Sequence, residues 1–284
     1  MTRRRDRSIL REVTDPAERL ATVLRSLPEP GLRVAFLRDY IAEGDDAERA
    51  RALDRLCEAG ARATPAARGP MLAVVMLFAQ MGEHPVLDRL GARAAALGLV
   101  SLGRLLRRAP KLAEPEGVAR VPDYGAGREL SLGERKSLAR RPNRAKLDRL
   151  LSDPHPAVIA QLLQNPRLTE DDLVRMAARR PGSAEIQRAI AQSPWLCRAR
   201  VRMALIQHPA TPSAIYIPLL GACTVPELVQ IRDGAEPLST LGATARELLG
   251  FRSLRPTALE LPQAGNVEGL RLHLSALNDN DREI

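Results

Sequence analysis

Apolar residues in the first hundred positions recur with the spacing of amphipathic helices, and proline or glycine interrupts them at short intervals. Asp15 and Pro16 supply a cap and a first-turn proline for a helix that ends near Leu27. Further helices are predicted at about 32–43, 46–59, 65–81 and from 85 onward, with 97–108 either a continuation of the last or a sixth helix. The stretch 65–81 carries the longest apolar run, which predicts the most buried helix.

The second half of the chain contains an internal repeat marked by proline. One series, Pro154, Pro181, Pro209 and Pro237, has spacings of 27, 28 and 28 residues, and Pro166 and Pro194 form a second series spaced by 28. Each proline follows a polar residue, and the segments between them have helical period. A pair of short helices every ~28 residues is typical of a helical solenoid, because one pair cannot bury its apolar stripe alone.

Breaks in this pattern predict the domain organisation. Three prolines and three glycines between residues 110 and 130 favour a linker. The last helices are expected at 225–233 and 239–249, closed by Gly250. The predicted segments are a basic, frayed N-terminus (1–13), a helical block (14–109), the linker (110–130), a helical repeat solenoid (131–250) and a polar C-terminal tail (251–284) that is disordered or loosely docked.

The segment Asn165-Pro166-Arg167-Leu168-Thr169-Glu170-Asp171-Asp172-Leu173, the Arg-Arg-Pro triplets at 140–142 and 179–181, and the paired short helices carry a resemblance to known proteins. They are similar to leucine-rich-repeat-variant and HEAT-like helical arrays, and more narrowly to a family of uncharacterised bacterial repeat proteins. The resemblance covers about residues 131–250. It implies an all-α fold and work as a protein-binding scaffold, and it implies no particular activity.

Composition agrees with a helical fold and indicates in which cellular compartment the protein is expected. Aromatic residues make up only 2 % of the chain, whereas sheets favour aromatic and β-branched residues. The basic start is not followed by an apolar segment, and the longest apolar run, Met71 to Ala79, is about half of what a membrane span requires. The three cysteines are odd in number and far apart, which favours a reduced compartment. A cytoplasmic protein without membrane insertion is expected.

Residue types that commonly form catalytic or metal sites are better explained in this sequence by capping and packing roles. No Gly-rich phosphate loop, HExxH, CxxC or nucleophile elbow occurs in the sequence. His84, His155 and His208 each precede proline, which favours cap residues over metal ligands. Thr169 and Asp172 have the spacing of a capping box, and Trp195 at a repeat junction favours a wedge between repeats over base stacking. No cofactor and no catalytic residue are predicted.

The net charge of +9 is concentrated in one stretch. Residues 131–209 contain 15 basic and seven acidic residues, and only three of the 43 basic residues of the chain are lysines. Stacked helices align equivalent faces, so these side chains are candidates for one continuous basic surface. The candidate residues are Arg135, Lys136, Arg140, Arg144, Arg175, Arg179, Arg198 and Arg202.

Three interpretations of this basic stretch remain open. It is a solvated face in an arginine-rich chain, the docking surface for an acidic protein partner, or a surface for nucleic-acid phosphates. The scarcity of aromatic side chains and lysine places nucleic acid last. The sequence therefore predicts a non-enzymatic protein–protein interaction scaffold with a basic face, and the alternative is a nucleic-acid-binding HEAT-like repeat protein. An enzyme such as a HEAT-like base glycosylase would require a pocket with stacking aromatic residues and a positioned carboxylate, and this sequence does not supply that combination.

Overall fold

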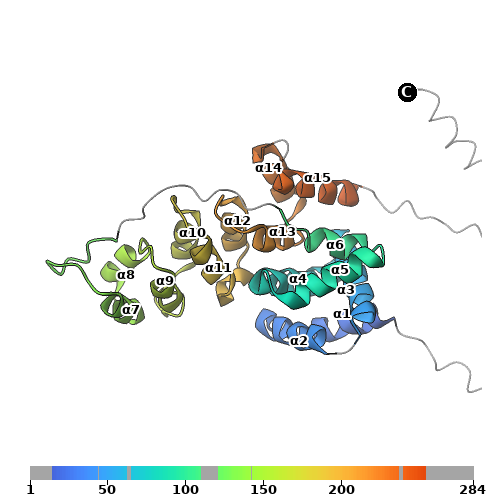
Figure 1. Cartoon of the computed structure of the whole chain (residues 1–284), viewed down its shortest axis with the longest axis horizontal. Coiled ribbons are helices and arrows are strands. Elements are labelled where there is room, and N and C mark those ends of the chain that lie inside the picture. The colour runs from blue at the N-terminus through green and yellow to red at the C-terminus, as the bar shows by residue number, and fades with distance from the viewer. Residues whose placement is uncertain are drawn as a thin grey trace, which may run out of the picture.

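A computed structural model describes residues 15–43, 45–62, 65–109, 121–141, 143–236 and 239–253. Within these ranges the chain is all-helical and contains no strand, so the predicted all-α class is confirmed. The helices (Figure 1) are α1 Pro16–Ser26, α2 Pro30–Ala42, α3 Asp46–Ala61, η2 Pro65–Ala67, α4 Arg68–Met81, α5 Pro85–Ala96, α6 Val100–Leu105, α7 Leu132–Arg140, α8 Arg144–Leu150, α9 Pro156–Leu162, α10 Glu170–Ala178, α11 Ala184–Ala191, η3 Pro194–Cys197, α12 Ala199–Gln207, α13 Ser213–Leu220, α14 Val225–Gly234 and α15 Thr240–Ser253.

Helix α4 is the centre of the N-terminal block, as its apolar run predicts. Every residue from Met71 to Ala79 except Leu72 is buried, and Phe78 is completely enclosed. Helices α1, α2 and α3 pack around it. The caps that start α1 and α3 are aspartates: the Asp15 and Asp45 carboxylates accept hydrogen bonds from the amides of Ala17 and Ala47.

Helices α7 to α12 alternate between two sides of the molecule. Helices α7, α9 and α11 pack in succession along one side, while α8, α10 and α12 lie along the other, and α10 packs directly on α12 (Figure 1). Helices α7 to α9 form one end of the molecule and α1 to α6 the other. This alternation places one short helix of each sequence repeat on each side.

The polar residues before proline shape the turns between these helices. Asp153 Oδ1 accepts a hydrogen bond from the amide of His155 at 2.8 Å, Asn165 Oδ1 from Arg167 at 3.0 Å, and His208 Nδ1 from Ala210 at 3.1 Å. Each bond therefore spans a proline, which has no amide hydrogen of its own. All three residues are buried. In these three pairs the polar side chain before proline therefore stabilises the turn.

Contacts between successive repeats have nearly the period of the sequence. Asn165 Nδ2 donates to the carbonyl oxygens of Ala139, 26 residues earlier, and Arg141. His208 Nε2 lies 2.9 Å from the carbonyl oxygen of Arg179, 29 residues earlier. The indole nitrogen of Trp195 donates to the carbonyl oxygen of Leu163, 32 residues earlier.

The two predicted blocks share one hydrophobic core. Helix α13 packs on α4 and α15 packs on α3, while the amide of Ala109 donates to Ser213 Oγ at 3.0 Å. Of the predicted linker, residues 110–120 lie outside the described residues, and within 121–130 Tyr124 is buried. The predicted N-terminus (1–13), residues 254–284 of the predicted tail (251–284) and Pro237 also lie outside the described residues.

Gly250 does not end the last helix, contrary to the sequence prediction. Helix α15 continues to Ser253 because the two residues before its end are held by the rest of the fold. The Arg104 guanidinium lies 4.1 Å from the Phe251 ring centroid. Arg252 donates to the carbonyl oxygens of Ala61 and Cys223. These tertiary contacts outweigh the weak local stop signal of one glycine.

Candidate protein-interaction surface

Arg135 is an interior residue and not part of an exposed basic surface, contrary to its place in the predicted set. It is 8 % exposed, and its Nη1 lies 2.8 and 2.7 Å from the two carboxylate oxygens of the fully buried Asp153. The Tyr124 hydroxyl donates to the same carboxylate at 2.5 Å. Burial, reinforced by this hydrogen bond, raises the pKa of Tyr124. The triad ties residues 121–135 to the turn before α9.

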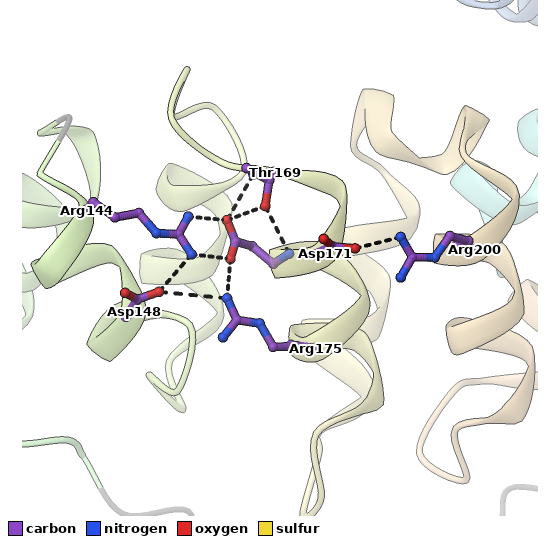
Figure 2. Close-up of polar contacts among 7 residues, drawn as sticks. Arg144, Asp148, Thr169, Asp171, Arg175 and Arg200 are labelled. Carbon is purple, nitrogen blue, oxygen red and sulfur yellow. Dashed lines mark hydrogen bonds and ion pairs between the residues drawn. The ribbon is translucent and has the colours of Figure 1, made fainter.

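Arg144 and Arg175 are held by two carboxylates between α8 and α10 (Figure 2). Arg144 forms a bidentate pair with Asp172, with nitrogen–oxygen distances of 2.5 and 2.6 Å, and also contacts Asp148. The Arg144 guanidinium holds the pKa of the Asp172 carboxyl far below its usual range, and Asp172 in turn raises the pKa of Arg144. The exposed charge expected from these arginines is therefore largely compensated.

The carboxylate of Asp172 also starts helix α10. It accepts hydrogen bonds from the amide and hydroxyl of Thr169, while Thr169 Oγ1 accepts one from the Asp172 amide. This confirms the predicted capping box. Negative charge belongs at a helix N-terminus, so the same side chain serves the helix and its neighbouring repeat.

Arg200 continues this series of charged contacts to α12, although the predicted set does not include it. Its Nη1 lies 2.6 Å from Asp171 Oδ1 (Figure 2). The two side chains are 61 % and 71 % exposed, so the pair is weak. The separation of 29 residues between Asp171 and Arg200, close to the 28 between Arg144 and Asp172, is a sequence signal for both pairs.

The other predicted cations have separate local environments. Arg179 donates to the carbonyl oxygen of Ser152 at 2.5 Å. Arg202 donates to the carbonyl oxygens of Leu196 and Cys197, and burial lowers its pKa. The remaining three are Arg140, which donates to Gln161 Oε1, the half-buried Lys136 and the exposed Arg198.

A surface groove of about 430 Å³ opens between α10, α12 and α14. Its apolar lining comes from short side chains and one methionine: Val174, Ala178, Ala199, Met203 and Ala204. Its polar lining consists of Arg180, Arg200, Gln207, His208, Glu227 and Gln230. Sequence reasoning missed this groove, because it depends on how three helices from successive repeats meet.

The charged side chains that line the groove differ in the hydrogen bonds and ion pairs that they form. Glu227 Oε2 accepts hydrogen bonds from the amide and hydroxyl of Thr224, at 2.6 and 2.8 Å, and so caps its own helix. Arg180 is exposed and forms no ion pair within the described part of the chain. Among the described residues, Arg200 pairs only with Asp171, and this pair is exposed. The groove therefore presents more available positive than negative charge.

The histidines of the His-Pro pairs are helix and turn caps, as predicted. His84 Nδ1 and His155 Nδ1 accept hydrogen bonds from the amides of Val86 and Ala157. His208 uses Nδ1 as an acceptor and its Nε2 hydrogen toward a carbonyl oxygen, and burial lowers its pKa. In the described ranges, no three His, Cys, Asp or Glu side chains form a cluster suited to a metal ion.

The chain matches no protein-family model, and comparisons with curated proteins and with solved structures likewise find no match. The HEAT-like resemblance therefore stays a prediction. None of the helices in the described ranges has the length and hydropathy needed to span a membrane. The geometry of the groove is the remaining basis for a functional proposal.

Proposed function

We propose that the chain is a non-enzymatic, cytoplasmic interaction scaffold, in which residues 131–250 form a HEAT-like helical solenoid that docks a partner protein. The groove between α10, α12 and α14 is the observation that carries this proposal. A groove with an apolar lining and a few charged groups at its edge suits a side chain or short segment of a partner protein. The regular spacing of contacts between repeats supports the solenoid part of the proposal.

Nucleic-acid binding is the second candidate, and a different part of the surface favours it. Arg141 and Lys146, at the junction of α7 and α8, are exposed and form no ion pair in the described ranges. Cations of this kind are suited to phosphate contacts. The groove itself has no aromatic side chain on which a base would stack.

Affinity capture with the tagged full chain separates the two candidates. The chain is incubated with lysate of the cells that make it, with and without prior nuclease treatment, and retained proteins are identified. The scaffold predicts specific protein partners that persist after nuclease treatment. Loss of every partner on nuclease treatment, together with retention of DNA or RNA, contradicts the scaffold and supports the second candidate.

A further inference from the structure

The groove between α10, α12 and α14 owes its depth to small residues. Ala178 of α10 and Ala199 and Ala204 of α12 line it where longer side chains would fill the space. Met203, half-buried beside them, has a flexible thioether side chain that adapts to different shapes. A groove of about 430 Å³ with this lining accommodates a large apolar side chain from outside the molecule.

The charges around the groove favour an acidic occupant. Arg180 has no ion-pair partner in the described ranges, and the Arg200–Asp171 pair is exposed enough to exchange partners. Glu227, the acidic residue of the lining, is already engaged by Thr224. Carboxylates approaching from outside would meet two available guanidinium groups, which pair well with carboxylates.

The first turn of α12 adds to this positive field at a cost to the helix. Arg198 stands at its N-cap position without a side-chain capping bond, and Arg200 follows as the second residue of the helix. Cations at a helix N-terminus interact unfavourably with the helix dipole. An acidic partner would relieve this unfavourable arrangement.

We propose that this groove binds an acidic peptide segment of a partner protein, which inserts one large aliphatic or aromatic side chain beside Met203 and pairs its carboxylates with Arg180 and Arg200. The inference rests on the proposed scaffold function and names the partner chemistry. A second copy of this chain is a poorer occupant, because the net charge of +9 makes two copies repel. The apolar lining without aromatic rings disfavours nucleic acid.

Selection of short random peptides displayed on phage, with the full chain as the target, tests this proposal. The expected result is enrichment of peptides in which Leu, Phe or Trp is flanked by Asp or Glu. The most enriched peptide is then synthesised and titrated against the full chain by calorimetry. Failure to enrich any sequence, or enrichment of peptides without acidic residues, would overturn the proposal.

Charge-reversal variants test whether the peptide binds in this groove. Arg180→Glu and Arg200→Glu are each expected to weaken binding of the synthetic peptide by at least about tenfold. Arg167→Glu is the matched control, because Arg167 is exposed before α10, forms no ion pair in the described ranges and does not line the groove. Circular dichroism and thermal unfolding verify that each variant is folded. Equal affinity for the wild type and both groove variants would overturn the proposal.

The same variants separate this inference from the scaffold function. If nuclease-resistant partners from the lysate also bind the Arg180→Glu and Arg200→Glu variants undiminished, the groove assignment fails and the scaffold function stands. If the wild-type chain captures no protein partner, the scaffold function fails whatever the peptides do. Competition for the groove between single-stranded DNA and the peptide would contradict the choice of a protein occupant.

Discussion

Arg144 and Asp172 form a bidentate ion pair, with distances of 2.5 and 2.6 Å, between helices that lie one repeat apart. Their separation of 28 residues equals the spacing of the prolines in the second series. Arg179 and the carbonyl oxygen of Ser152 are linked across 27 residues in the same way. Polar contacts therefore join successive repeats at the repeat period, in addition to the shared apolar core.

Asp172→Ala is expected to destabilise the chain by about 2 kcal/mol, because it removes both a helix cap and charged hydrogen bonds to two arginines. The Asp172 side chain is 1 % exposed, so water cannot replace these bonds without rearrangement. Urea unfolding of the full chain measures the effect. The neighbouring substitution Asp171→Ala is the control and is expected to cost less than about 1 kcal/mol, since its pair with Arg200 is exposed. Equal effects of the two substitutions would contradict the assigned roles.

Arg135→Leu is expected to destabilise the chain by about 3 kcal/mol, because it leaves the buried Asp153 carboxylate without its counter-charge. The double variant Arg135→Leu with Asp153→Asn is expected to be more stable than Arg135→Leu alone. Asparagine removes the charge and keeps the Oδ1 acceptor for the amide of His155, while its Nδ2 replaces the second carboxylate oxygen and donates to the Tyr124 hydroxyl oxygen. Chemical denaturation of the two variants checks this order, and the reverse order would contradict a buried ion pair at this place.

Local signals in the sequence predicted the helices and their caps, because these depend on neighbouring residues. Asp15 before Pro16, Thr169 with Asp172, and the apolar run of α4 all act in the predicted way. The candidate surface was predicted less well. The helical spacing of Arg198 and Arg202 suggests one face, yet Arg202 reaches back to two carbonyl oxygens and Arg200 carries the ion pair to α10. Which arginine finds a carboxylate depends on how the repeats stack, and composition does not contain that information.

Cleavage within the predicted linker is expected to leave two fragments that remain associated. Trypsin has sites there at Lys111 and Arg120, in the proline- and glycine-rich segment where the sequence predicts first cleavage. The fragments share one core through the packing of α13 on α4, and Glu247 of the second fragment pairs with Arg104 of the first. Limited proteolysis followed by gel filtration under native conditions tests this expectation. Separate elution of the fragments would show that the two blocks do not depend on each other's packing.

Acidification below neutral pH is expected to destabilise the chain through His208. Burial lowers the pKa of its imidazole from the ordinary value of 6.5, and the nearby Arg180 opposes a second positive charge. Protonation would also place a hydrogen on Nδ1, which accepts the amide of Ala210 at 3.1 Å. The unfolded chain therefore binds a proton at this residue more readily than the folded chain. The stabilisation is complete above pH 6.5 and decreases as the pH falls below that value toward the lowered folded pKa.

His208→Asn isolates this contribution, because asparagine keeps an acceptor for the amide two residues later, as Asn165 does before Pro166, but does not titrate. We expect the free energy of unfolding of the wild type to decrease more steeply than that of the variant as the pH falls from about 7 to about 5. Urea unfolding at a series of pH values measures both slopes. The Asp172 carboxyl, whose pKa lies far below its usual range, stays ionised in the folded chain throughout this window. Parallel slopes for the wild type and the variant would contradict a buried neutral His208, since the substitution would then have removed no titrating group that differs between the folded and unfolded states.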